Sequence, residues 1–242
     1  PNTPLQRYLY SVNAVVLNNY YCGAGQEEKI TVNHGLGHIS IEQCADEQEL
    51  DRAVVRSLLD QRAIYPFVDR RRAFRDLVSQ PLINDSARNI HNVQAAKNIA
   101  FLLDDRDFSS AENMVKAISD SNFDIVVINP LFHARQAFDA ADVRRMQFKK
   151  NGGKRLLIAE MNVSEASPQD YFWKNRWHKG NPSWLVRESF VTPGAYITRY
   201  WAEEWQQIIS RHFKDIVATG YDGVFFTGLQ NHNYFEHLTP LE

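Results

Sequence analysis

The sequence lacks long hydrophobic runs, an excess of charge of one sign and a cysteine framework. Its longest apolar runs are only a few residues long, well short of the roughly 20 residues that cross a bilayer, so we expect no membrane span. Lys and Arg number 27 and Asp and Glu 29, which gives a net charge of −2. This balance argues against a dedicated nucleic-acid-binding protein. No glycine-rich phosphate motif follows an apolar run, and the sequence implies no cofactor.

The two cysteines, Cys22 and Cys44, do not have the spacing of a zinc site, so we expect no metal centre. Each of them follows a predicted strand. We favour two separate buried thiols, and the alternative is a disulfide, which would fit an oxidising compartment. We expect an extracellular or periplasmic location. Residues 1–10 show no signal-peptide pattern, so we expect a mature or trimmed chain.

Hydrophobic residues make up 44% of the sequence, enough for a sizeable core. Short runs rich in Val, Ile and Phe recur along the chain, with helical patterns between several of them. The runs predict strands at residues 14–18, 38–43, 63–68, 99–103, 124–129, 155–161, 195–198 and 223–227.

Apolar spacing and end signals predict the helices. A stripe over residues 50–59 has helical periodicity. Ser109 and Glu112 form a capping box, which predicts a helix from there to about Ser119. A further helix is expected over residues 142–150, before an Asn-Gly-Gly stop. A long apolar face between residues 201 and 217 predicts a helix that Gly220 ends.

Eight apolar runs in 242 residues suit a (β/α)8 TIM barrel that forms a single domain over residues 1–242. The alternative is an open, doubly wound sheet. In a barrel of this kind, the functional site lies where the strands end. Carboxylates, amides and aromatic residues follow the predicted strands, a lining that suits a ligand rich in hydroxyl groups.

The candidate carboxylates at these strand ends are Glu42, Asp104, Asp105 and Glu165. Asp104 and Asp105 could instead favour the N-terminus of the helix that follows them. The residues that could bind a sugar are Asp105, Asn129, Thr227, Gln230 and Asn231, together with the rings of Tyr171, Trp173, Trp184 and Tyr200. The aromatic residues over 171–184 could equally form a core plug. They belong to a segment expected to be irregular, residues 165–193, and irregular segments of this length are often functional.

Several motifs occur in one order in the C-terminal half of the chain. They lie at residues 163–167 (VSEAS), 171–173 (YFW), 181–185 (NPSWL), 196–201 (YITRYW), 204–205 (EW) and 220–224 (GYDGV). In this order the motifs resemble those of the family-114 glycoside hydrolases, the endo-alpha-1,4-polygalactosaminidase-like TIM barrels. The resemblance covers about residues 99–236. It implies an endo-acting hydrolase without a cofactor, whose partner is a carbohydrate polymer resembling a galactosaminoglycan.

The N-terminal part resembles strands that follow the GYDGV strand in that family. These segments are residues 17–19 (LNN), 41–43 (IEQ) and 63–70 (AIYPFVDR). Because they come first in this chain, we expect the strand order to be circularly permuted relative to the family. Chain ends at a barrel surface can move without changing the packed core.

The chain departs from the family where the resemblance implies acids, because Asn129, Thr227 and Gln230 stand at those positions. Glu165 is kept. An amide or a hydroxyl cannot replace a catalytic carboxyl group, so hydrolysis requires Glu165 to pair with Glu42, Asp104 or Asp105. One alternative is a catalytically inactive barrel that binds a polysaccharide. Another is a scaffold domain that uses its aromatic loop as a protein interface.

Overall fold

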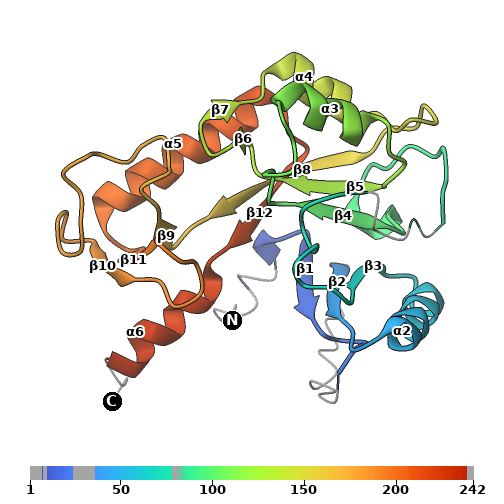
Figure 1. Cartoon of the computed structure of the whole chain (residues 1–242), viewed down its shortest axis with the longest axis horizontal. Helices are drawn as coiled ribbons and strands as arrows, with labels where there is room; N and C mark the ends of the chain where they lie inside the picture. Colours follow the sequence, from blue (N-terminus) through green and yellow to red (C-terminus); the bar gives the residue numbers. More distant parts are fainter. Residues whose placement is uncertain (1–6, 8–9, 24–35, 78–81, 83, 239–242) are drawn as a thin grey trace. The chain divides into compact units, whose positions relative to one another are not determined.

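A computed structural model describes residues 7, 10–23, 36–77, 82 and 84–238. The chain divides into two compact units (Figure 1). Unit 1 comprises Pro1–Ile128 and Arg144–Leu157, and unit 2 comprises Asn129–Val143 and Ile158–Glu242. The single domain over residues 1–242 remains a prediction.

The strands of unit 1 pair in parallel. β1 (Ala14–Asn18), β2 (Gly37–Gln43) and β3 (Ala63–Phe67) form a sheet in that order. β4 (Ile99–Leu102) pairs in parallel with β5 (Ile125–Ile128). All residues of β4 and β5 are buried, as expected for parallel strands that are covered on both faces.

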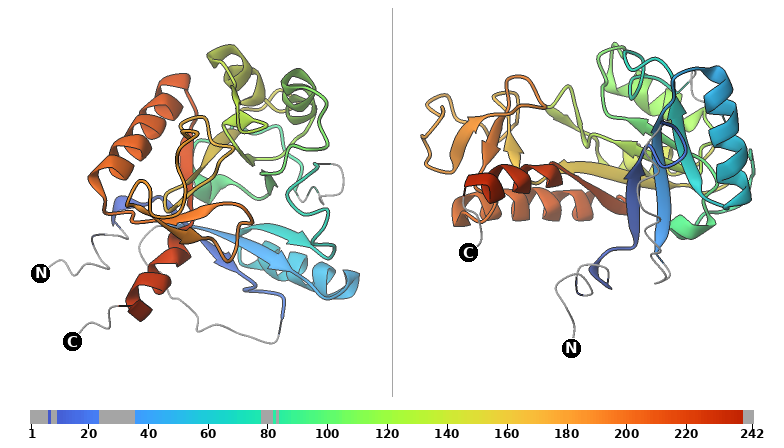
Figure 2. Two further views of the ribbon diagram at one scale, coloured as in Figure 1. Left: turned by 60° about the vertical axis from the view of Figure 1, so that its left-hand side comes forward. Right: turned by 90° about the horizontal axis from the view of Figure 1, so that it is seen from below.

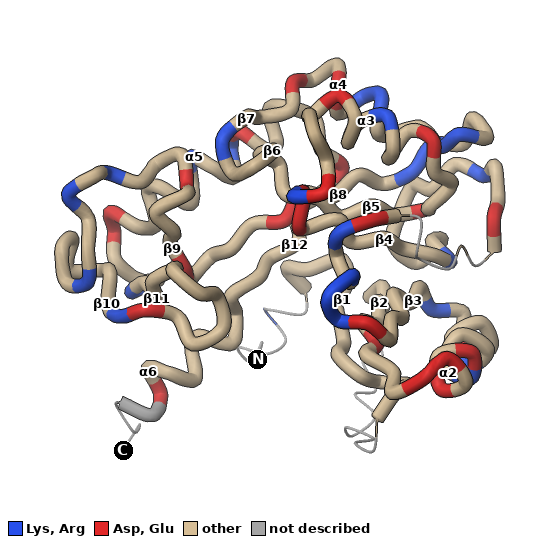
Figure 3. The backbone as a smooth tube through the Cα atoms, viewed as in Figure 1, with Lys and Arg blue, Asp and Glu red and all other residues tan. Residues whose placement is uncertain are grey.

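The helices of unit 1 begin at polar caps. α2 (Glu47–Leu59) starts after Asp46, whose side chain accepts a hydrogen bond from Glu49 N. Acidic and basic residues are mixed along this helix (Figure 3). α3 (Ala111–Ser119) is capped by Ser110 rather than by Ser109, one residue later than predicted. The reason is that Ser110 Oγ accepts from the backbone of Asn113, whereas Ser109 Oγ accepts from the Asn113 side chain.

A buried ion pair holds the end of unit 1 together. Lys149 Nζ lies 2.6 Å from Asp124 Oδ1, and neither side chain is exposed. The same ammonium donates to the carbonyl oxygens of Ser86 and Arg88, so its hydrogen bonds are satisfied within the protein. A short helix between Val93 and Ala95 (η1) precedes β4.

Unit 2 is built on the parallel pair of β8 (Leu156–Asn162) and β12 (Gly223–Thr227). β8 begins in unit 1 and continues into unit 2. α5 (Glu203–Thr219) packs on one face of the pair, where Ile216 contacts Ala159 and Met161 (Figure 2). Because side chains alternate along a strand, Glu160 and Asn162 lie on the opposite face. α5 ends at Gly220, as predicted.

α4 (Ala140–Met146) is shorter than the predicted helix over residues 142–150. The chain turns instead, because Phe148 pairs with Lys154 and Lys149 N donates to Gly153 O. A small antiparallel pair, β6 (Leu131–Phe132) and β7 (Gln136–Ala137), precedes this helix.

The run predicted as a strand at residues 195–198 is not part of a parallel pair. β11 (Tyr196–Thr198) lies between β10 (Leu185–Glu188) and β9 (Glu165–Ala166), antiparallel to both. The long segment expected to be irregular supplies these two partners, so β11 pairs with strands that are near in sequence. Beyond β12, η2 (Leu229–Asn231) leads into α6 (His232–Leu238).

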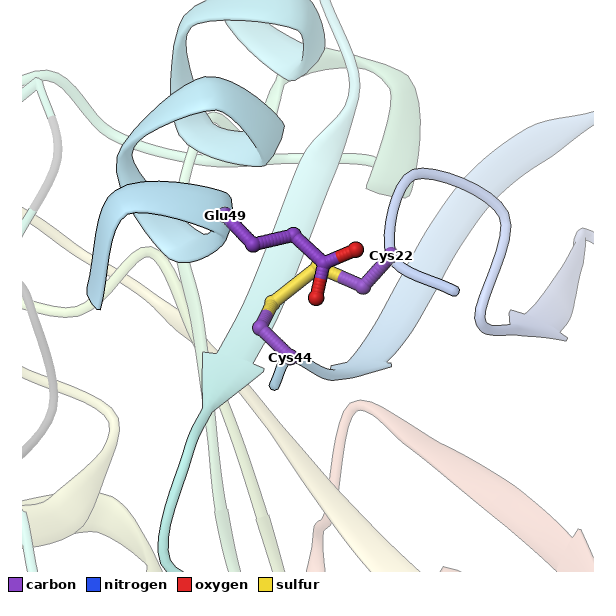
Figure 4. Close-up of side chains that lie close together, drawn as sticks. All are labelled: Cys22, Cys44 and Glu49. Atoms are coloured by element: carbon purple, nitrogen blue, oxygen red, sulfur yellow. A yellow bond between two sulfur atoms is a disulfide. The ribbon is translucent and has the colours of Figure 1, made fainter. Parts of the chain in front are cut away.

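The expectation of two separate thiols is wrong, because Cys22 and Cys44 form a disulfide in unit 1 (Figure 4). The parallel pairing of β1 and β2 brings the residues that follow these strands together. The chain is therefore an α/β protein with parallel sheets, and the closed barrel remains a prediction. In the described part of the chain, no helix combines the length and apolar character needed to cross a bilayer.

Candidate functional site

Glu165 is the centre of a polar cluster within unit 2. It begins β9 and is buried, with 6% of its surface exposed. Its Oε1 accepts hydrogen bonds from Ser189 Oγ at 2.5 Å and Asn231 Nδ2 at 3.1 Å. Its Oε2 accepts from Thr192 Oγ1 at 2.7 Å and Asn162 Nδ2 at 3.2 Å. These four donors complement a negative charge and fix the orientation of the carboxylate.

The backbone before Glu165 is shaped by Asn162, the last residue of β8. Asn162 Oδ1 accepts from the backbone N–H groups of Ser164 and Glu165. Ser164 Oγ donates to Gly228 O and accepts from Asn231 Nδ2. Gly228 has a φ of 80°, and a Cβ there would lie 2.6 Å from Ser164 Oγ and collide with Asn162. Only glycine therefore fits where β12 leads into η2.

Glu160 is the second carboxyl group of this cluster, on the face of β8 opposite α5. Burial raises the pKa of Glu160. The hydroxyl of Thr227, which donates to Glu160 Oε1, acts in the opposite direction, while the negative charges of Asp170 and Glu165 raise the pKa further. The balance favours the protonated form of Glu160 near neutral pH more than is usual for a glutamate.

Asp170 is the third acid of the cluster. Burial raises the pKa of Asp170 to about 6, although its carboxylate accepts a 2.6 Å hydrogen bond from Ser167 N. Glu160, which is partly buried and has a raised pKa, lies in the same cluster as Glu165, which accepts four hydrogen bonds, and a difference of this kind between two acids is typical of acid–base sites. The cluster can therefore supply a proton donor, Glu160, and a fixed carboxylate, Glu165.

Two of the predicted sugar-binding residues lie in this cluster. Thr227 contacts Glu160, and Asn231 contacts Glu165. Gln230 is exposed beside Asn231 in η2. Asn129 also belongs to unit 2, where its side chain accepts from Leu131 N at 2.9 Å.

The aromatic residues of unit 2 divide into buried and exposed groups. Trp184 is buried against Trp205 and donates to Glu204, so it forms part of a core with α5. Trp173 is partly buried and stacks on Tyr196. For Trp184 and Trp173, this packing agrees with the alternative in which the aromatic residues over 171–184 form part of the core. Tyr171 and Tyr200 remain exposed.

Glu42, a predicted partner of Glu165, lies in unit 1 and is fully buried. Its carboxylate accepts from the backbone N–H groups of Tyr20, Tyr21 and Cys22, and from the hydroxyl of Ser40. Glu42 thus holds the turn that follows β1.

Asp104 and Asp105, the other predicted partners, also lie in unit 1. Hydrogen bonds from the Arg106 guanidinium lower the pKa of Asp104, despite its partial burial, and Arg75 lies 3.8 Å away. Asp105 is partly exposed, and its carbonyl oxygen accepts from Phe108 N. Asp104 is consequently an ion-pairing carboxylate, which favours its charged form.

Cys22, Cys44 and Glu49 are the group of potential metal ligands found among the described residues. The two sulfurs are bonded to each other, and the Glu49 side chain lies beside them (Figure 4). Glu49 accepts from Ala45 N and Gly23 N, which lowers its pKa. These contacts give Glu49 a structural role around the disulfide.

Comparisons with known proteins identify distant relatives without a described activity. The chain is 27% identical to an uncharacterized protein of Methanocaldococcus jannaschii over 158 residues, 64% of this chain and 45% of that protein. It is 24% identical to an uncharacterized protein of Thermotoga maritima over 119 residues, 49% of this chain and 36% of that protein. A third uncharacterized protein, from Deinococcus radiodurans, is 30% identical over 114 residues, 47% of this chain and 35% of that protein.

The chain spans less than half the length of each of these relatives. No family model matches it. The similarities establish distant homology to uncharacterized proteins and assign no family.

Sequence reasoning placed Glu160 and Asn162 at the end of a predicted strand but gave neither a catalytic role, and it assigned no role to Asp170 or to the hydroxyl donors Ser189 and Thr192. One signal was present, since Glu160 interrupts the apolar strand LLIAEMN, and a carboxyl group within such a strand is seldom buried without a partner. Ser189 and Thr192 gave no signal, because the hairpin that carries them toward Glu165 is a tertiary feature.

Proposed function

We propose that this protein is an endo-acting glycoside hydrolase that cleaves an amino-sugar polysaccharide resembling a galactosaminoglycan. The observation that carries the proposal is that Glu160 and Glu165 belong to one polar cluster in unit 2, near enough for the charge of Glu165 to raise the pKa of Glu160. Glu160 has a raised pKa, and Glu165 is held as an acceptor of four hydrogen bonds. Glycoside hydrolysis uses two carboxyl groups in these two states.

In the proposed reaction, Glu160 donates its proton to the oxygen of the scissile glycosidic bond as that bond breaks. The carboxylate of Glu165 stabilises the positive charge that develops on the sugar ring, or accepts a proton from the water molecule that attacks the anomeric carbon. Asp170 contributes through its negative charge, which raises the pKa of Glu160. Asn162 and Asn231 orient Glu165.

The second candidate is a catalytically inactive barrel that binds the same polymer. One specific observation favours it: the four hydrogen bonds that the Glu165 carboxylate accepts come from protein side chains, among them Ser189 and Thr192. A substrate hydroxyl would have to replace one of these donors. Asn129, Thr227 and Gln230 also stand where the resembled family carries acids.

For the fold, we propose a circularly permuted TIM barrel. The parallel pairing of β1, β2 and β3, of β4 and β5, and of β8 and β12 supports it, and so does the position of Thr227 and Asn162 at the ends of their strands. We propose an extracellular or periplasmic location, which the disulfide supports, because such bonds persist in oxidising compartments.

The test is the release of reducing ends from a purified, partly N-acetylated galactosamine polymer. The wild-type chain should release them, and Glu160→Gln and Glu165→Gln should each lower the rate by a factor of about 10² or more. The matched control is Glu203→Gln, an exposed acid in the first turn of α5, which should retain the wild-type rate.

Two results would oppose the proposal. Undiminished release by Glu165→Gln would remove that residue from the reaction. Saturable binding of the polymer by the wild-type chain, with no release of reducing ends, would instead favour the inactive binding barrel.

A further inference from the structure

Five aromatic side chains and one arginine contact one another at the surface of unit 2. We call it the aromatic strip; its members are Arg187, Phe190, Tyr200, Trp201, Tyr234 and Phe235. The guanidinium of Arg187 lies 3.6 Å from the ring centre of Phe190 and 5.5 Å from that of Tyr234. Phe235 lies 5.0 Å from Tyr234, 4.6 Å from Trp201 and 5.8 Å from Tyr200, measured between ring centres.

Several rings of the strip remain open to solvent. The exposed fraction is 70% for Phe190, 51% for Trp201 and 40% for Tyr200. Exposed aromatic residues that contact one another are uncommon on a protein surface without a ligand or partner, because burying their faces is favourable. The strip also differs from the core around Trp184 and Trp205, where the rings are buried against α5.

The aromatic strip is built on the same elements that hold Glu165. Phe190 stands between Ser189 and Thr192, whose hydroxyl groups donate to the Glu165 carboxylate. Tyr234 and Phe235 lie in α6, which directly follows Asn231, another donor to Glu165. The strip is therefore carried by the same segments of the chain as the candidate site.

We propose that the aromatic strip is a binding subsite for the sugar rings of the polysaccharide chain next to the linkage at Glu165. The inference rests on the proposed function and extends it. Its occupant is a pyranose chain, whose C–H faces can stack on Trp201, Tyr200 and Phe190. Its hydroxyl groups can bond to the hydroxyl groups of Tyr200 and Tyr234 and to the guanidinium of Arg187.

A sugar chain fits the strip better than an apolar protein segment. Four of the six side chains, those of Arg187, Tyr200, Trp201 and Tyr234, carry polar groups that can bond to the hydroxyl groups of a sugar. Interfaces between proteins also use aromatic residues, but the same segments hold a carboxylate cluster suited to glycosidic bonds, which favours the polymer.

The test measures binding separately from cleavage. Trp201→Ala and Phe190→Ala are introduced into the Glu160→Gln chain, so that the partly N-acetylated galactosamine polymer is not consumed. Binding is measured by calorimetry. The matched control is Phe213→Ala, which removes an aromatic ring on α5 that is as exposed as Tyr200 and lies outside the strip.

Each strip variant should bind the polymer about tenfold more weakly than the parent chain, and the Phe213→Ala control should bind as the parent does. Far-ultraviolet circular dichroism should be the same for all four chains. Phe190 lies in an exposed loop, so that variant tests the strip even where Trp201→Ala disturbs folding.

Binding by both strip variants that equals that of the parent would overturn the inference, as would a parent chain that does not bind the polymer. Self-association that Trp201→Ala abolishes, without polymer binding, would overturn it in favour of a protein interface. Weaker binding by the variants, together with no reducing-end release by the wild-type chain, would leave the subsite in place and reject the hydrolase. Reducing-end release by the wild-type chain, together with unaltered binding by the variants, would support the hydrolase and reject the subsite.

Discussion

At the scale of single residues, the carboxyl groups of unit 2 make stability and activity depend on pH in a defined direction. Asp170 has a pKa of about 6 in the folded chain, against about 3.9 for an aspartate in an unfolded chain. Below about pH 4 both states hold the proton, and this contribution to stability is fully present. It is lost as the pH rises from about 4 to about 6, because over this range the unfolded state has released its proton while the folded state still holds it.

Asp170→Asn should therefore make the chain more stable at pH 7, by up to about 3 kcal/mol, and flatten the fall in stability between about pH 4 and pH 6. The amide oxygen can still accept the hydrogen bond from Ser167 N. The measurement is urea unfolding at a series of pH values. Glu203→Gln is the control, and its profile should follow the wild type. An equally steep profile in Asp170→Asn would contradict the assignment of the slope to this residue.

The same substitution should alter catalysis through Glu160. As a proton donor, Glu160 must be protonated, so the rate of hydrolysis should fall as the pH rises through its pKa. Asp170→Asn removes one of the negative charges that raise this pKa, and the alkaline limb of kcat should move to lower pH. The measurement is the pH profile of reducing-end release. An alkaline limb that stays in place would show that a group other than Glu160 controls it.

At the scale of secondary-structure elements, α5 gives a clean test of backbone strain. Gly220 ends this helix with a φ of 100°, and a Cβ built there meets no atom within 4 Å. Gly220→Ala should therefore lower the free energy of unfolding by about 1 kcal/mol through the backbone alone. Gly220→Asn should cost less, because asparagine tolerates this conformation. Denaturant unfolding of both variants measures the difference, and equal losses would show that side-chain contacts contribute.

The elements also show where sequence patterns suffice. The ranges of β1 and β12 agree with the predicted runs, because each is a short β-branched or aromatic segment bounded by polar or glycine residues. The run that becomes β11 has the same character, but its pairing is antiparallel. Periodicity indicates that a segment is extended, whereas the partner of a strand depends on which other strands the chain brings near.

The candidate site follows the same rule. Glu165 could be singled out from its motif, and Asn231 and Thr227 from their position after a strand. The partner carboxyl group could not be chosen in this way, since Glu42, Asp104 and Glu160 all follow or lie within apolar runs. The surroundings of the three carboxyl groups distinguish them. Backbone N–H groups fix Glu42, and Arg106 pairs with Asp104. The negative charges of two neighbouring acids raise the pKa of Glu160.

At the scale of the whole molecule, the question is whether the parallel strand pairs close into an eight-stranded barrel. A closed eight-stranded barrel needs each strand to pair on both edges. In the part of the chain that the structure describes, β1, β2, β3, β4, β5, β8 and β12 take part in parallel pairs, and β11 does not supply a further one. The sequence predicted the class of sheet correctly, because buried parallel strands are continuously apolar, but closure depends on contacts that this pattern does not encode.

The disulfide provides the last test, since it ties together two segments that separate strands carry. Cys22 and Cys44 are 22 residues apart, and a cross-link that closes a loop of this size restricts the unfolded chain enough to contribute about 3 kcal/mol. The double variant Cys22→Ala/Cys44→Ala should lose about this much stability in urea. A reducing agent should destabilise the wild-type chain comparably and leave the double variant unchanged. A reducing agent that lowers the stability of both chains equally would mean that its effect does not pass through this bond.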